Sequence, residues 1–216
     1  MNKVSIKRRI AIVIVVVLAV LTMVYPAFAT TNFKAYSVYR KKDFFGSKEW
    51  HAGLMQATDC TYSGNPVIHV SSQGSYCADA VSWSGYMGSL DEEHFKGVYA
   101  PNTTMSSTKK NDVVDTAQDL TSTNMAYTLL RQLDYDTSIM DSTKVQPDEV
   151  EEMRCDGLVE YSYEYNDVRI CGPSGSSGWN ISIKHATTYG YGDDYTPYQQ
   201  AVDFMTLIQT GIPSAD

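Results

Sequence analysis

The chain has 216 residues, with 17 lysines and arginines against 25 aspartates and glutamates, and a formal net charge of −8. This length is enough for one domain with a sizeable core. The acidic balance argues against a nucleic-acid partner, because phosphate binding requires a basic surface.

The first 29 residues have the pattern of a secretory signal peptide. Four basic residues stand near the start, residues 10–24 are apolar apart from Thr22, and Ala27-Phe28-Ala29 has the small-x-small form of a cleavage site. The apolar run is short for a membrane span, so an uncleaved anchor is the less favoured alternative. Cleavage removes four basic residues and no acidic one, which leaves a charge of −12. We expect a single mature domain, residues 30–216, that is secreted or associated with a bacterial cell wall and has no stable membrane span.

The first part of this domain is predicted to form strands. Residues 33–42 alternate loosely and are rich in aromatic and β-branched residues, which favours a strand. Residues 50–55 and residues 66–71 are two further strands, separated by a turn-rich segment. We expect these two to pair as a hairpin, with His51 near its beginning and His69 near its end.

The middle of the chain is predicted to change from strand to helix. Residues 78–90 are ambiguous, and residues 95–100 form a strand that is stopped by Pro101. Residues 102–111 have the composition of a polar loop. In residues 112–120, apolar residues recur on one side, which predicts a helix.

Helices are expected to dominate the last part. Pro147 and the aspartate after it suit the start of a helical region. This region leads into a helix that begins near Cys155 and runs to about residue 166. Residues 168–171 are predicted to be a short strand, and residues 196–209 a last helix. Because strands come first and helices later, the predicted fold class is α+β.

Cys155 stands in the first turn of its predicted helix. It belongs to an apolar face, whereas Glu160 and Glu164 lie away from that face and are expected to be solvated. The positive end of the helix macrodipole favours thiolate over thiol at this position. Such a thiolate is a nucleophile when a histidine can reach it; a small core residue is the plain alternative.

The mature chain has four cysteines: Cys60, Cys77, Cys155 and Cys171. In an exported protein an even number suggests disulfides, with three connectivities to choose from. A bond between Cys155 and Cys171 would remove the nucleophile, whereas a bond between Cys60 and Cys77 would leave it free. The spacing alone does not choose between them.

Two of the four histidines are the best candidates for a base. A cysteine nucleophile needs a base beside its thiol and a third polar group that holds the other nitrogen of the base. His51 and His69, on adjacent strands, would supply both. His94 stands beside two glutamates and is expected at the surface. His185 follows Cys155 but is surrounded by residues typical of a loop, so it is less favoured.

These segments together resemble a known family. His51-Ala52-Gly53-Leu54, followed by Val67-Ile68-His69-Val70-Ser71, looks like the hairpin of the NlpC-type papain-like cell-wall hydrolases. Cys155-Asp156-Gly157-Leu158-Val159 looks like the cysteine helix of that family, Cys-Ser-Gly followed by apolar residues. The order, histidines before cysteine, matches the circularly permuted branch, which includes YiiX-like proteins and the lecithin–retinol acyltransferase type. In that branch a helix and a tyrosine-bearing segment come between hairpin and cysteine, where this chain has residues 112–120 and 126–128.

The resemblance implies a permuted papain-like fold, in which a small antiparallel sheet packs against helices and the catalytic cysteine begins one of them. It implies Cys155 as nucleophile, His51 as general base and His69 as orienter. Tyr127 would correspond to a tyrosine near the oxyanion site. Arg154 replaces the usual acidic residue before the cysteine, and such a cation would help to hold a thiolate. Two further departures are an aspartate in place of the usual serine and a longer interval between the histidines.

Three functions follow as expectations. The first is an exported thiol hydrolase that cleaves an amide or ester bond through an acyl-enzyme, with cell-wall peptide as the substrate that the resemblance implies. The second is a non-catalytic exported binding or structural domain on the same fold, with Cys155 disulfide-bonded or idle. The third is a lipid-directed acyltransferase. No metal or cofactor is expected, because the spacings of the candidate ligands match no compact zinc pattern; those ligands are His51, Cys60, His69 and Cys77.

Overall fold

The computed structural model describes residues 32–44, 47–60, 64–72, 77–129, 131–135, 144–170 and 196–213, with side chains at 42–49 left out of the account. These residues all belong to one compact unit, residues 32–216. The expected signal peptide, Cys171 and His185 lie outside the described residues. Within the described ranges, no helix combines the length and the apolarity needed to cross a membrane.

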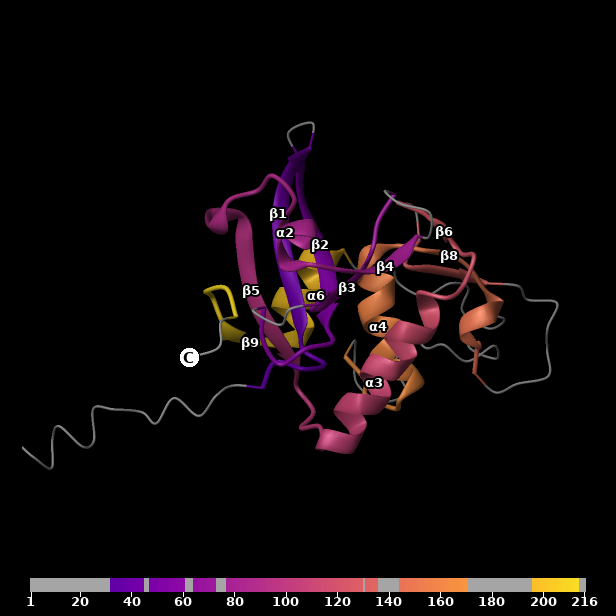
Figure 1. Cartoon of the computed structure of the whole chain (residues 1–216). Coiled ribbons are helices and arrows are strands. Elements are labelled where there is room, and N and C mark those ends of the chain that lie inside the picture. The colour runs from indigo at the N-terminus through magenta and orange to yellow at the C-terminus, as the bar shows by residue number, and fades with distance from the viewer. Residues whose placement is uncertain are drawn as a thin grey trace, which may run out of the picture. The chain divides into compact units, whose positions relative to one another are not determined.

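Six strands form one antiparallel sheet in the order β4-β3-β2-β1-β5-β9 (Figure 1). The strands are β1 (Ser37–Phe44), β2 (Ser47–Met55), β3 (Val67–Val70), β4 (Ala78–Val81), β5 (Phe95–Pro101) and β9 (Met205–Gln209). β2 and β3 pair only through Leu54↔Ile68 and Met55↔Val67. The expected hairpin is therefore confirmed, and its ladder ends at Leu54 and Ile68, so that neither His51 nor His69 belongs to a paired position of these two strands.

Helices and a small second sheet complete the described fold. The helices are α2 (Trp83–Met87), α3 (Ser107–Leu120), α4 (Cys155–Tyr165) and α6 (Pro197–Phe204), with two 3-10 turns, η1 (Glu92–His94) and η2 (Pro147–Glu149). The small sheet has the order β6-β8-β7, from Ala126–Tyr127, Val150–Met153 and Leu133–Tyr135. α4 packs against β2, β3, α3 and α6. In Figure 1, α3 and α4 lie between the large sheet and the small one.

The large sheet separates two apolar clusters. On the α4 side, Tyr39 of β1 and Leu54 of β2 belong to the same cluster as Leu158 and Val159 of the helix. On the other side, Val38, Met55 and Val67 pack against Tyr86 of α2. An antiparallel sheet with helices packed against it confirms the predicted α+β class.

Burial of α4 corrects one expectation. Glu160 is fully buried and Glu164 is 9 % exposed, so neither is solvated. The helix contacts the sheet and two other helices, and therefore has no solvent-facing side along its first ten residues. A central helix of this kind carries polar residues only where buried partners bind them.

Two predicted segments differ from the structure near α3 and α4. The expected loop 102–111 is wrong from residue 107 on, because the Ser106 hydroxyl accepts from the Lys109 N–H (3.2 Å) and starts α3 there. The expected strand at 168–171 is absent from its described part, residues 168–170. There the Val168 N–H donates to the Tyr163 carbonyl (2.9 Å), as the chain leaves α4.

Two more predicted helical stretches are interrupted by strands. After Pro147 only the 3-10 turn η2 forms, because Val150 is extended and pairs with Tyr135 as part of β8. The last helix ends at residue 204 and not 209. Met205 is extended and begins β9, which pairs with β5 through Pro101. Both strands are stabilised by partners far away in sequence, which local patterns do not reveal.

Candidate active site

Two histidines meet where the ladder between β2 and β3 ends. The Nε2 atom of His51 lies 2.8 Å from the Nδ1 atom of His69, and the rings are perpendicular. One of these nitrogens donates and the other accepts, so at least one ring is neutral. Because Nε2 of His51 is engaged, Nδ1 is the nitrogen that remains for a further partner.

Burial and a nearby cation keep both rings uncharged. Burial first, then the Arg40 guanidinium and His69, hold the pKa of His51 well below its usual 6.5. Burial and the same guanidinium lower the pKa of His69 to about 4, against a smaller opposite effect of Asp79. At neutral pH the pair is therefore two neutral imidazoles, and His51 is able to take up a proton.

Cys155 is the first residue of α4, and its thiol is buried. The side chain is 3 % exposed and the thiol is free. Its sulfur accepts hydrogen bonds from the backbone N–H groups of Ala52 and Asp156. Since Ala52 directly follows His51, the thiol lies against the peptide group that joins these two residues. The structure thus brings His51 and His69 together and sets the Cys155 thiol against the peptide group between His51 and Ala52.

The pKa of the Cys155 thiol corrects the expectation of a thiolate. Burial, followed by the negative charge of Asp156, raises this pKa to about 12. The two backbone N–H groups and the Arg154 guanidinium act in the opposite direction but are outweighed. A helix N-terminus contributes only a modest stabilisation to an anion, which desolvation exceeds here. At rest the thiol is therefore neutral, as are the two imidazoles.

Arg154 lies at the N-cap of α4 and is tied to Asp156. Its Nε donates to Oδ1 (2.6 Å) and its Nη2 to Oδ2 (2.9 Å) of that carboxylate, which is fully buried. Burial raises the pKa of Asp156, while the bonds from Arg154 lower it. Arg154 favours the Cys155 thiolate as expected, but Asp156 opposes it more strongly.

A buried hydrogen-bond network fixes the first turns of α4. The Gln132 amide donates to Asp156 Oδ2 (3.0 Å) and to Glu160 Oε2 (3.2 Å). The Gln200 amide donates to the Asp156 carbonyl (3.0 Å) and to the same Glu160 oxygen (3.2 Å). The Tyr39 hydroxyl in turn donates to Gln200 (2.9 Å). The network therefore ties the cysteine helix to β1, α6 and the segment before β7.

Tyr127 lies on β6, opposite Met153 in the parallel pairing with β8. It is half-buried and packs against the main core. Because Met153 stands two residues before Cys155, Tyr127 is near the start of α4. Its role at an oxyanion site stays a prediction.

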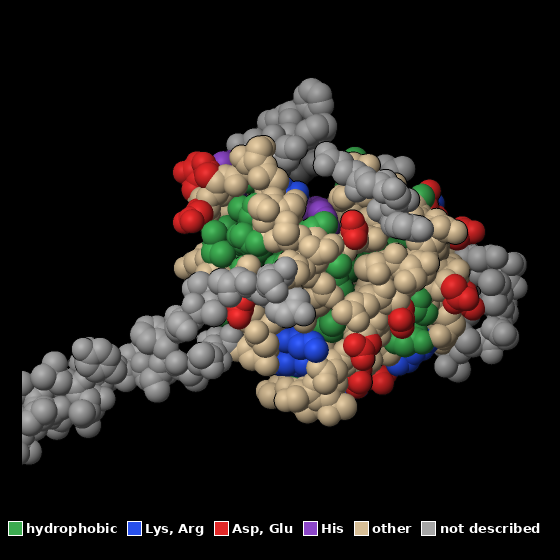
Figure 2. Space-filling view, viewed as in Figure 1, with side chains coloured by type: hydrophobic (Ala, Val, Ile, Leu, Met, Phe, Trp, Pro, Cys, Tyr) green, Lys and Arg blue, Asp and Glu red, His purple; other side chains and the backbone are tan. Residues whose placement is uncertain are grey.

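Two site residues were not identified from the sequence. Tyr86 is fully buried, and its hydroxyl lies within hydrogen-bond distance of the Val38 and His51 carbonyls (2.8 and 3.0 Å). Arg40 stands opposite His51 in the β1–β2 register. Arg40 could have been found only from the register of β1 against β2, and the sequence pattern alone does not fix that register. Figure 2 shows that histidine side chains, drawn in purple, reach the surface on the face in view.

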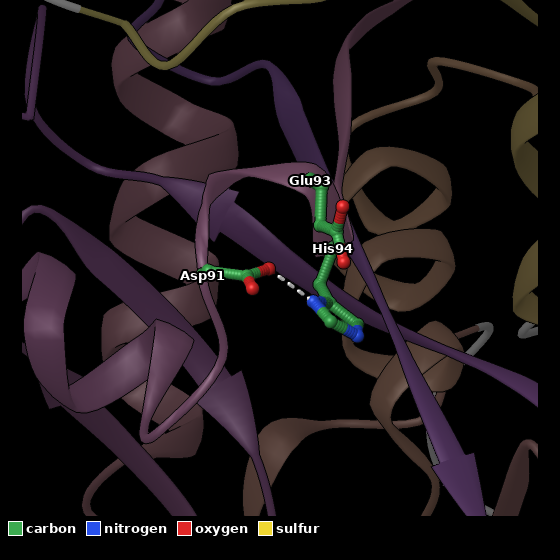
Figure 3. Close-up of side chains that lie close together, drawn as sticks. All are labelled: Asp91, Glu93 and His94. Atoms are coloured by element: carbon green, nitrogen blue, oxygen red, sulfur yellow. Dashed lines mark hydrogen bonds and ion pairs between the residues drawn. The ribbon is translucent and has the colours of Figure 1, made fainter.

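A second group of polar side chains lies on η1, away from the cysteine. Asp91 and Glu93 are exposed, His94 is partly exposed as expected, and their potential ligand atoms lie within 4.8 Å of one another (Figure 3). Nδ1 of His94 is paired with Asp91. Exposed groups of this kind are common on acidic surfaces, and nothing else at this turn points to a metal ion.

The described cysteines carry free thiols. Cys60 is partly buried, and Cys77 and Cys155 are buried, with no disulfide among the three. In comparisons with models of known families, with curated proteins and with solved structures, nothing matched this chain.

Proposed function

We propose that this protein is an exported thiol hydrolase with a permuted papain-like fold, which cleaves an amide or ester bond through an acyl-enzyme at Cys155. The observation that carries the proposal is the position of the thiol. Its sulfur accepts a hydrogen bond from the backbone N–H of Ala52, the residue after His51. The Nε2 atom of His51 is in turn hydrogen-bonded to His69 (2.8 Å). A nucleophile, a base and an orienter are the three parts that such chemistry needs.

The proposed reaction begins from a neutral Cys155 thiol and a neutral His51 imidazole. As the sulfur attacks the carbonyl carbon, Nδ1 of His51 takes the thiol proton, and His69 holds the ring through Nε2. Backbone N–H groups at the start of α4, including that of Cys155, stabilise the oxyanion. The imidazolium then gives its proton to the leaving amine or alcohol. Water, activated by the same ring, releases the acyl group and regenerates the thiol.

The fold and the resemblance support this proposal in different ways. An antiparallel sheet packed against helices, with the cysteine first in a helix, is the arrangement expected of a permuted papain-like domain. A cell-wall peptide is the substrate that the resemblance implies. A lipid-directed acyltransferase would use the same residues and differ in the acceptor.

One observation favours the second candidate, a binding or structural domain with an idle cysteine. The thiol is 3 % exposed and its pKa is raised to about 12, as for an ordinary core cysteine. The two candidates differ in whether His51 increases the reactivity of this thiol.

The test is acylation by p-nitrophenyl acetate at pH 7. For a hydrolase we expect a burst of about one equivalent of p-nitrophenolate and an acetyl group on the peptide that contains Cys155. His51→Gln should slow this acylation by about 10²- to 10⁴-fold, because the general base is lost. His94→Gln is the matched control, a histidine of the same fold outside the site, and should leave the rate unchanged. Equal rates in all three proteins would contradict the hydrolase and leave the binding domain.

A further inference from the structure

Arg40 is the one charged group described here that shares an aromatic platform with the histidine pair. Its guanidinium carbon lies 5.3 Å from the ring centroid of Tyr86. The same ring lies 5.8 Å from the His51 ring and 5.7 Å from the His69 ring. A cation at this distance from a tyrosine face is held by the ring quadrupole. Arg40 is thus held beside the histidine pair.

The guanidinium has an unused hydrogen-bonding edge. Its Nη1 donates to the Met87 carbonyl (3.3 Å). Its Nε is buried, yet no described residue accepts a hydrogen bond from it. The ion pairs among the described residues involve other cations. A buried donor without an acceptor is unfavourable, so this edge is suited to a group that arrives from outside.

The chain itself shows what such an edge binds. Nε and Nη2 of a guanidinium lie on one side and match the two oxygens of a carboxylate. Arg154 uses this edge for Asp156, at 2.6 and 2.9 Å. Arg40 presents the corresponding edge beside His51, without a carboxylate from the described part of the protein.

We infer that Arg40 binds a carboxylate of the acyl substrate, so that the enzyme selects amides or esters with an acidic group near the scissile bond. This inference rests on the proposed function and names its substrate class. Arg40 is then a specificity residue: its fork fixes the acid, and the scissile carbonyl is directed toward Cys155.

A second consequence concerns the base. Arg40 is a cause of the low basicity of both imidazoles. A bound carboxylate would neutralise this cation and raise the pKa of His51 toward its ordinary value. Substrates with the acid would therefore be bound and would also meet a stronger base, whereas neutral substrates would gain neither effect.

The test compares two acyl esters of the same chain length, p-nitrophenyl hemisuccinate and p-nitrophenyl butyrate, on the full chain. For the unmodified protein we expect acylation of Cys155 by the hemisuccinate to be at least about tenfold faster, which is about 1.4 kcal/mol. Arg40→Gln should abolish this preference. Arg40→Lys, which keeps the charge without the fork, should retain only part of it and guards against a folding defect.

The matched control is Lys110→Gln. Lys110 also lies over a tyrosine, Tyr36, at 4.0 Å from the ring centroid, but on α3. Its loss should not change the ratio of the two rates. Equal acylation by both esters in the unmodified protein, or a preference that survives Arg40→Gln, would overturn the inference and leave the hydrolase intact. If neither ester acylates Cys155, the proposed function itself is wrong.

Discussion

At the scale of single residues, the reactivity of Cys155 is decided by a competition. Burial and the Asp156 carboxylate hold the proton on sulfur, whereas two backbone N–H groups and Arg154 favour its loss. Burial and the carboxylate outweigh the other two effects, so the thiol keeps its proton. The site therefore resembles the neutral serine–histidine type more than a preformed thiolate–imidazolium pair, and His51 has to act during the attack.

Removing the carboxylate should shift this balance. We expect Asp156→Asn to lower the pKa of Cys155 by roughly one unit or more, because a like charge is removed and Arg154 becomes uncompensated. The measurement is the pH dependence of iodoacetamide labelling at the Cys155 peptide. Asp134→Asn is the control, since Asp134 also pairs with an arginine, Arg131, at 2.7 Å but elsewhere. An unchanged profile in Asp156→Asn would show that burial alone sets the thiol pKa.

The acid limb of acylation should lie below the range of an ordinary histidine. His51 is the base only when neutral, and its pKa is held well below 6.5. We therefore expect the acylation rate of the unmodified protein to stay level from pH 7.5 down past pH 6.5 and to fall only at lower pH. In Arg40→Gln the fall should begin at higher pH, because one cause of the low pKa is absent. A rate that already halves near pH 6.5 in the unmodified protein would contradict this assignment.

At the scale of elements, the start of α4 depends on a close approach of two backbones. A Cβ atom at Gly157 would lie 1.9 Å from the Gln132 carbonyl oxygen. This segment also supplies the Gln132 amide that binds Asp156 and Glu160. The glycine of the cysteine motif is therefore required by packing, since any side chain would separate the helix from the segment that fixes it.

Gly157→Ala should therefore be severely destabilising. We expect the free energy of unfolding to fall by about 3 kcal/mol or more, because backbone has to move to admit the methyl group. Urea unfolding followed by circular dichroism measures this loss. Gly211→Ala is the matched control, as no atom lies within 4 Å of the added Cβ there. Similar urea midpoints for the two variants would show that the Gln132 backbone can move away without loss of stability.

Some elements of the fold and of the site could be predicted from the sequence and others could not. The hairpin and the extent of α4 were predictable, because their signals are local: alternation, an apolar face and two histidines on adjacent strands. β8 and β9 were not, since each is defined by pairing with a distant segment. The buried state of Glu160 follows from glutamines 28 and 40 residues away. Arg40 belongs to the same class, because its place beside His51 comes from strand register.

At the scale of the whole molecule, the buried titratable groups limit the pH range in which the fold is most stable, on the acid side and on the alkaline side. The pKa of His69 is lowered to about 4 and that of His51 is also low, so the unfolded chain takes up their protons first as the pH falls below 6.5. Burial raises the pKa of the Cys77 and Cys155 thiols to about 12, so the unfolded chain loses those protons first above pH 9.0. Folding should therefore be most favourable between these limits.

The acid side of this window gives a quantitative expectation. Between pH 6.5 and about 4, His69 should lower the free energy of unfolding by up to about 1.4 kcal/mol per pH unit, because the unfolded chain binds a proton there that the folded protein does not bind. His51, whose pKa is also lowered, should act in the same direction. His69→Gln removes one of these groups, so its stability should decline less steeply with acid than that of the unmodified protein, even where its stability at pH 7 is lower. Urea midpoints at pH 7, 5.5 and 4.5 measure the two slopes. Parallel slopes would mean that His69 is protonated within the fold, and that the pair with His51 is not the neutral pair on which the proposed reaction depends.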